Sequence, residues 1–169
     1  MLDFLESHFL EEEENVISFF TEDIDFELPQ EEQRMQWVRA VIQCENCTLK
    51  VINYIFCSDD YLHKINVEYL QHDTLTDIIT FPYDEPPIIH SDIFISIDRV
   101  RENAKEHQVS FEQELNRVLI HGVLHLCGYK DKGEQEEKLM RQKEDEMLAL
   151  FGDQSIISPH QNRLNHSQL

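Results

Sequence analysis

The chain is organised around the stretch His121-Gly-Val-Leu-His-Leu-Cys-Gly-Tyr-Lys-Asp131, in which two histidines stand four residues apart. On a helix of about 3.6 residues per turn, positions i and i+4 lie on one face, so His121 and His125 can direct two imidazoles at one ion. Gly128 tolerates the left-handed backbone that ends a helix, and the chain can then turn back and bring Asp131 to the same ion. The stretch therefore predicts a metal site made of His121, His125 and Asp131.

The donor set indicates a catalytic site. Two imidazoles and one carboxylate leave a coordination position open, as in catalytic rather than structural zinc sites. Mn²⁺, Fe²⁺ or Ni²⁺ could compete with Zn²⁺ for these donors. The histidine pair alone would also fit a core helix whose ring nitrogens are satisfied by other groups, but the glycine at +7 and the aspartate at +10 favour the metal. We expect one Zn²⁺ at the end of a core helix.

The residue after the first histidine bears on the reaction class. In metalloproteases of this frame a glutamate stands there and acts as general base. Gly122 occupies the position here and cannot accept a proton. Peptidase chemistry is therefore disfavoured, although a peptidase or another zinc hydrolase stays an alternative.

Hydropathy patterns predict the remaining elements. β-Branched and aromatic runs predict strands, and apolar residues at 3/4 spacing predict helices. In chain order they are a strand over 16–20, a helix from Pro29 to the turn at Cys44–Cys47, a strand over 49–57, a helix capped by Ser58, strands over 78–81 and 92–97, a helix over 98–107, the histidine-bearing helix capped by Ser110, and a last helix between Gly133 and Gly152. We expect an α/β (α+β) domain with one mixed sheet of about four strands covered by helices.

Composition sets the boundaries of that domain. Residues 1–15 form an acidic N-terminal extension, residues 16–152 a single metalloenzyme domain, and residues 153–169 a polar tail that we expect to be disordered. No apolar run reaches the roughly 20 residues that span a bilayer, and the start lacks the basic flank of a secretory signal. We expect a cytoplasmic protein with no membrane partner.

The four cysteines do not resemble a disulfide framework in such a protein. They are Cys44, Cys47, Cys57 and Cys127. The lone Cys44-x-x-Cys47 pair is interpreted as two small apolar residues at a helix end, with half of a zinc knuckle or a redox pair as alternatives.

The net charge of −20 opposes binding to nucleic acid, because phosphate contacts usually need Lys and Arg. The uneven distribution of charged residues along the chain weakens this argument against nucleic-acid binding. Residues 1–33 hold 12 of the 34 acids and no base, so the other 136 residues carry 22 acids and 14 bases. A local basic face is one interpretation, and a solvated acidic protein is the other. Candidates for that face are Arg99, Arg101, Lys105, Arg117, Lys130 and Lys132.

Several motifs together resemble one family. His121-Gly-Val-Leu-His-Leu-Cys-Gly-Tyr129 matches the HGxLHLxGY signature of the YbeY family of metal-dependent endoribonucleases. Thr76-Asp-Ile-Ile-Thr-Phe-Pro82, preceded by Ile65-Asn66, and Asp92-Ile-Phe-Ile-Ser96 resemble two further family segments, in matching order. The resemblance covers roughly residues 16–152. It implies a zinc-dependent enzyme that cleaves single-stranded RNA in 16S rRNA 3′-end maturation and ribosome quality control, with rRNA and the ribosome or its proteins as partners.

Three positions depart from the family pattern. The third family ligand is usually His and is Asp131 here, and the preceding Asp is Lys130. Leu70 stands where the family has an arginine thought to face the substrate phosphate, which removes a bidentate contact. His72, Lys64 or Lys132 are candidates to replace that cation.

Two interpretations of the cleft and of the function stay open. Asn66, Thr76 and Asp77 either shape the cleft or serve as helix and loop caps. The alternative to a nuclease is a ribosome-associated assembly factor whose zinc is mainly structural, which Leu70 and the charge of −20 favour.

Overall fold

The computed structural model describes residues 15–71 and 76–152, so the predicted tail, most of the N-terminal extension and His72 lie outside the described residues. In chain order the elements are β1 (Val16–Thr21), α2 (Glu31–Cys44), β2 (Thr48–Cys57), α3 (Asp59–Leu70), β3 (Ile78–Pro82), β4 (Ile88–Ser96), α4 (Ile97–Glu106), α5 (Phe111–Leu126) and α6 (Glu134–Leu150). The predicted order of strands and helices is confirmed. Within the described ranges, no helix is long and apolar enough to cross a membrane.

The four strands form one mixed sheet in the order β1-β2-β4-β3. β1, β2 and β4 run parallel, whereas β3 is antiparallel to β4 and forms an edge of the sheet. This arrangement confirms the predicted mixed sheet of about four strands.

The boundaries of the fourth strand were predicted wrongly. β4 begins at Ile88, directly after Pro87, rather than at Asp92, and ends at Ser96. His90 and Asp92 are only partly buried, on the side of the sheet away from the main core, so polar residues are tolerated in the strand. Ile97 belongs to α4 instead, because the Ser96 hydroxyl accepts a hydrogen bond from the Arg99 amide and caps that helix.

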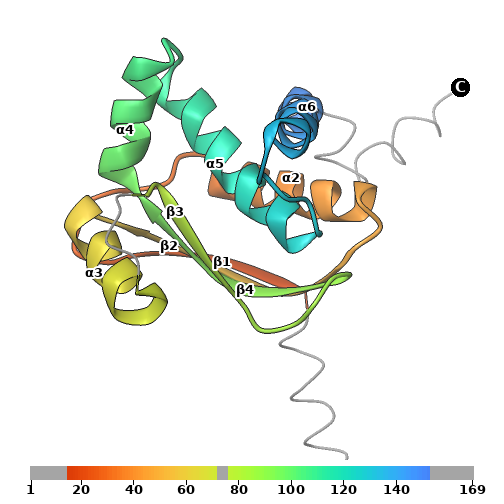
Figure 1. Cartoon of the computed structure of the whole chain (residues 1–169), viewed down its shortest axis with the longest axis horizontal. Coiled ribbons are helices and arrows are strands. Elements are labelled where there is room, and N and C mark those ends of the chain that lie inside the picture. The colour runs from red at the N-terminus through yellow and green to blue at the C-terminus, as the bar shows by residue number, and fades with distance from the viewer. Residues whose placement is uncertain (1–14, 72–75, 153–169) are drawn as a thin grey trace, which may run out of the picture.

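Helices cover the sheet on both faces. α2, α5 and α6 lie on one face, and α3 lies on the other (Figure 1). The alternation of β2 builds both layers: Ile52, Tyr54 and Phe56 enter the large core, while Cys57 enters a smaller one beneath α3.

Buried hydrogen bonds fix the helical layer against the sheet. Tyr54 donates its hydroxyl hydrogen to the Leu119 carbonyl of α5 at 3.1 Å, and Trp37 donates its indole N–H to the Met147 carbonyl of α6 at 2.8 Å. α5 also begins with a capping box between Ser110 and Gln113, at the predicted cap. These contacts place the histidine-bearing helix at a defined height above the strands.

The four cysteines are free, as predicted. Cys44 is exposed, Cys47 and Cys127 are half-buried, and Cys57 is buried.

Gly122 lies where α5 packs closely on the sheet. A Cβ added there would lie 2.8 Å from Ile78 Cδ1 and 3.6 Å from Ile93 atoms. Gly122 is buried, one residue after the first histidine. The glycine therefore lets the helix pack directly on β3 and β4.

We expect Gly122→Ala to lower the free energy of unfolding by about 1–3 kcal/mol, because the methyl group overpacks this contact. Ile78→Val removes the opposing Cδ1 atom. We therefore expect the Gly122→Ala/Ile78→Val double variant to be non-additive. Its loss in free energy of unfolding, measured by urea denaturation, should be at least about 1 kcal/mol smaller than the sum of the losses in the two single variants. Additive losses would show that Ile78 is not the group that the methyl displaces.

Candidate metal centre

The end of α5 is a Schellman motif that turns the chain back on itself. The Tyr129 amide donates to the Leu124 carbonyl, and the Gly128 amide donates to the His125 carbonyl, both at 3.0 Å. Gly128 has φ of 109°, the left-handed conformation that glycine adopts without a steric penalty. The turn lets Asp131 return to the face of α5 that carries the histidines.

The three predicted ligands converge on one point. His125 Nε2 lies 2.9 Å from His121 Nε2 and 3.2 Å from Asp131 Oδ2, and His121 Nε2 lies 3.5 Å from the same oxygen. Their side chains are 25%, 29% and 41% exposed for His121, His125 and Asp131, so the cluster is open to solvent on one side. Within the described residues, this is the one group of His, Cys, Asp and Glu with the geometry to hold a metal ion.

The hydrogen bonds made by the Nδ1 atoms of His121 and His125 show whether the two Nε2 atoms are able to bind a cation. His125 Nδ1 lies 2.9 Å from the Tyr129 carbonyl, and His121 Nδ1 lies 3.3 Å from Glu144 Oε2. Both partners only accept hydrogen bonds, so each Nδ1 carries the hydrogen and each neutral ring presents a lone pair at Nε2. Two lone pairs and a carboxylate oxygen then face one another, an arrangement that a cation between them would stabilise. The donor set suits a divalent transition metal.

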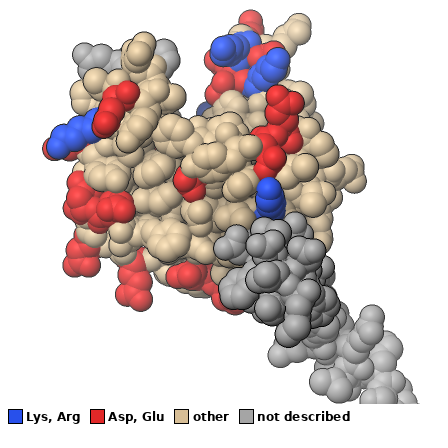
Figure 2. Space-filling view, turned by 90° about the horizontal axis from the view of Figure 1, so that it is seen from below, with Lys and Arg blue, Asp and Glu red and all other residues tan. Residues whose placement is uncertain are grey.

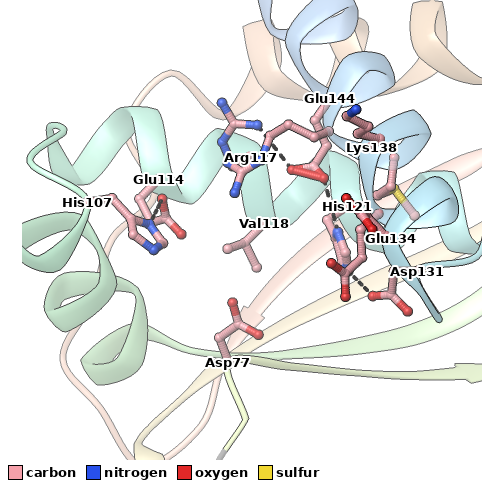
Figure 3. A pocket seen from close by; sticks show the side chains of 13 residues that line it. Asp77, His107, Glu114, Arg117, Val118, His121, Asp131, Glu134, Lys138 and Glu144 are labelled. Carbon is pink, nitrogen blue, oxygen red and sulfur yellow. Dashed lines mark hydrogen bonds and ion pairs between the residues drawn. The ribbon is translucent and has the colours of Figure 1, made fainter.

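Glu144 supports His121 from α6. Glu144 is 5% exposed, and its carboxylate accepts hydrogen bonds from His121 Nδ1 and from Arg117 Nη1, the latter at 3.1 Å. Burial alone would raise its pKa, but the His121 and Arg117 hydrogen bonds outweigh burial and lower it. Burial likewise lowers the pKa of His121, whereas the Glu144 hydrogen bond and the Glu144 and Asp131 charges raise it overall. Figure 3 shows the resulting row from Arg117 through Glu144 and His121 to Asp131.

The sequence interpretation did not assign Glu144 to the site. Acidic residues surround it in α6, but Glu144 lies between the buried Met140 and Met147 at 3/4 spacing. A carboxylate on the buried stripe of a helix is the signal that could have revealed it.

Further contacts hold the turn that carries Asp131. Tyr129 donates its hydroxyl hydrogen to Glu45 Oε2 at 2.7 Å, and the Lys143 ammonium lies 3.6 Å from Glu45 Oε1. The C-terminal ends of α2 and α5 and the middle of α6 are thereby joined beside the candidate metal centre.

Two cavities, each about 620 Å³, meet at the centre and share Asp77, His121 and Asp131. We call them the α6-side cavity and the β3-side cavity. The lining of the α6-side cavity is rich in charges: Asp77, His107, Glu114, Arg117, Asp131, Glu134, Glu137, Lys138, Arg141 and Glu144. The lining of the β3-side cavity is mostly uncharged: Asn66, Leu70, Thr76, Asp77, Ile78, Ile79, Thr80, His121, Gly122, His125 and Asp131.

The predicted cleft residues all line the β3-side cavity. Asn66, Thr76 and Asp77 contribute to its wall, together with Leu70. Burial raises the pKa of Asp77, although the nearby charges of His121 and Arg99 oppose the increase. Leu70 therefore lies where a cation would reach a substrate at the metal centre.

Two of the three candidate replacement cations are absent from the cavity linings, and the third, His72, lies outside the described residues. Lys64 and Lys132 line neither cavity. Arg99 pairs with Asp59 at 2.7 Å, and Arg117 pairs with Glu144 and Asp145. The face seen in Figure 2 carries widely spread acidic side chains and few basic ones. A local basic face, one of the two interpretations of the charge distribution, is not seen in this view.

The peptidase interpretation loses support from the packing of Gly122. A glutamate at this position would start from a Cβ only 2.8 Å from Ile78 Cδ1. The position faces the sheet rather than solvent, so the missing general base has a steric reason.

Comparisons with known proteins agree on one family. The family model described as Endoribonuclease YbeY matches residues 16–152. The chain is similar to the Endoribonuclease YbeY of Flavobacterium psychrophilum, with 58% identity over 132 residues that cover 78% of this chain and 94% of the relative. It is also similar to the Endoribonuclease YbeY of Christiangramia forsetii, with 51% identity over 139 residues that cover 82% and 96%.

A solved structure has the same fold. The solution structure of TM1509 from Thermotoga maritima superposes with a TM-score of 0.59 at 26% sequence identity, covering 85% of this chain and 94% of that chain. The similarity of fold thus extends over most of the chain.

We expect Glu144→Ala to weaken divalent-metal binding by about 10- to 100-fold, because His121 loses the acceptor that orients its ring. Glu144→Gln keeps an oxygen acceptor and should have a smaller effect. Asp145→Ala is the matched control, since Asp145 also pairs with Arg117 but is 60% exposed. Zn²⁺ affinities from competition with a fluorescent chelator check the prediction, and equal affinities for the Glu144→Ala and Asp145→Ala variants would contradict it.

Proposed function

Because the chain belongs to the endoribonuclease YbeY family, we propose that it is a zinc-dependent endoribonuclease that cleaves single-stranded RNA. The mutual approach of His121 Nε2, His125 Nε2 and Asp131 Oδ2 carries this proposal, because a divalent cation bound between two imidazole nitrogens and a carboxylate oxygen would stabilise their contact. The endoribonuclease name that these relatives share supports RNA as the substrate. We propose residues 16–152 as the catalytic domain, which is the range that the family model matches.

The biological role follows from the family resemblance. We propose that the enzyme acts in the cytoplasm on the 3′ end of 16S rRNA and in ribosome quality control. Its partners would then be rRNA and the ribosome or ribosomal proteins. The HGxLHLxGY signature at His121–Tyr129 supports this assignment.

Each residue of the centre has a distinct role in this proposal. His121, His125 and Asp131 would hold the metal, and Glu144 and the Tyr129 carbonyl keep the two imidazole rings in the tautomer that presents Nε2. A bound divalent cation supplies Lewis-acid chemistry toward a phosphoryl oxygen. The two cavities lie on either side of the ligands, so a single strand can extend away from the centre in both directions.

The acidic character of the chain does not oppose this function at the centre itself. Among the residues that line the β3-side cavity, Asp77 and Asp131 are the only carboxylates, and Asp77 has a raised pKa because it is buried. A divalent cation beside Asp131 would give this cavity a local positive charge. An RNA phosphate can then approach from the β3 side without crossing the acidic α6 side.

We expect one metal ion per chain in the native protein and less than half an ion in Asp131→Ala, because the variant lacks one of three ligands. Glu134→Ala is the matched control, since Glu134 lines the same cavity but is outside the ligand group. Metal content after gel filtration, measured by inductively coupled plasma mass spectrometry, checks this expectation. Unchanged occupancy in Asp131→Ala would remove Asp131 from the ligand set.

The function itself is tested by incubating the metal-loaded protein with single-stranded rRNA fragments. We expect cleavage by the native protein and by the His107→Ala variant, since His107 lines the α6-side cavity but is not one of the metal ligands. The double variant His121→Ala/His125→Ala should lose cleavage by at least about 100-fold, because no metal is held.

Two outcomes would overturn the proposal. Equal cleavage by the double variant, purified identically, would point to a contaminating ribonuclease. A protein that unfolds on chelation but cleaves no RNA at any metal loading would instead be the assembly factor with a structural zinc.

A further inference from the structure

β3 is an edge strand, and its free edge borders the metal centre. Ile78, Ile79 and Thr80 line the β3-side cavity opposite His121 and His125. β4 is the only strand that pairs with β3 among the described residues. Among the described residues, no strand covers the backbone groups on the other edge of β3, which border this cavity.

The register shows which residues point their backbone groups outward. In an antiparallel pair, residues alternate between positions that bond to the partner strand and positions that do not. The Ser96 amide donates to the Asp77 carbonyl at 2.9 Å, and the Tyr83 amide donates to the His90 carbonyl at 2.8 Å. Odd-numbered residues of β3 therefore bond to β4, and Ile78 and Thr80 direct their N–H and C=O groups away from it.

Pro82 agrees with this assignment. It occupies the next outward position, where the missing N–H costs the sheet no hydrogen bond. At the other end, the Ile78 carbonyl accepts a hydrogen bond from Thr76 Oγ1 at 3.2 Å. Both backbone groups of Thr80 and the amide of Ile78 have no hydrogen-bond partner among residues 15–71 and 76–152.

The rest of the lining indicates the chemistry of the ligand. The β3-side cavity has no Lys or Arg in its lining. Recognition of a substrate there depends on the cation at the centre and on neutral hydrogen-bonding groups. Thr80 offers one donor and one acceptor side by side, which matches a nucleobase edge or a 2′-hydroxyl better than a phosphate, since a phosphate only accepts.

We propose that the free edge of β3 binds the RNA nucleotide next to the metal centre through the backbone groups of Thr80 and the amide of Ile78. The two amides lie about 7 Å apart along the strand, since each residue rises about 3.3 Å. The edge would thus bind neutral groups of the nucleotide, while a cation held by His121, His125 and Asp131 would supply Lewis-acid chemistry at its phosphate. This inference rests on the proposed RNA substrate and assigns a binding surface within that site.

Proline substitution removes one edge amide without breaking the sheet. Thr80→Pro deletes the outward N–H and the side-chain hydroxyl, and Thr80→Val deletes the hydroxyl alone, so their difference reports the amide. We expect a labelled single-stranded oligoribonucleotide to bind the zinc-loaded Thr80→Pro protein about three- to tenfold more weakly than Thr80→Val, measured by fluorescence anisotropy. Zinc content and melting temperature should stay equal in the two variants. If Thr80→Pro fails to fold, Ile78→Pro against Ile78→Val tests the same edge.

Binding and cleavage separate this inference from the proposed function. Weaker binding by the proline variant supports the edge even if the native protein cleaves no RNA, in which case only the proposed function fails. Equal RNA affinities of the proline and valine variants, or no RNA binding by the native protein, would overturn the edge assignment. An extended peptide that binds the native protein but not Thr80→Pro, while RNA binds both alike, would assign the edge to a peptide strand and also overturn it.

Discussion

The contact between Gly122 and Ile78 is the constraint on which the site depends. It lets α5 lie directly against β3 and β4, because no side chain separates the helix from the strands. His121 is next to this contact, and His125 is one turn further along, so both imidazoles emerge where the helix passes the sheet edge. A larger residue at position 122 would lift the helix and move both rings relative to β3. The same glycine that excludes a protease-type base therefore positions the ligands.

Groups outside the signature complete the geometry. Glu144 comes from α6 and fixes the His121 tautomer, while the Tyr129 carbonyl fixes that of His125. The two supports differ in kind, because the carbonyl belongs to the local Schellman turn and the carboxylate depends on the packing of two helices. Arg117 links the two helices. It stands one turn before His121 on α5 and forms an ion pair with Glu144 of α6. The orientation of His121 is consequently sensitive to how α5 and α6 pack, whereas that of His125 is set by the Tyr129 carbonyl, four residues further along the chain.

This difference explains what sequence reasoning could and could not predict. The order of the elements and the convergence of His121, His125 and Asp131 follow from local periodicity, capping and helix-ending signals, and the structure has both. The role of Glu144 does not follow, because it is 23 residues from His121 and the contact arises only from tertiary packing. The start of β4 at Ile88 was missed because the polar run His90-Ser91-Asp92 interrupts the apolar pattern after Ile89. The outward direction of Thr80 depends on strand register, which the sequence pattern alone did not specify.

The two cavities differ in the charge of the residues that line them. The α6 side combines several carboxylates with the paired Arg117, whereas the β3 side has an uncharged wall next to the ligands. For a protein of net charge −20, RNA is repelled from most of the surface, since long-range attraction to phosphates needs excess positive charge. Such repulsion penalises non-specific binding everywhere except where a local cation and neutral hydrogen-bonding groups act together. The acidic surface and the neutral strand edge are therefore compatible. The selection of a substrate over other polyanions then depends on the contacts within the site rather than on electrostatic attraction to the protein as a whole.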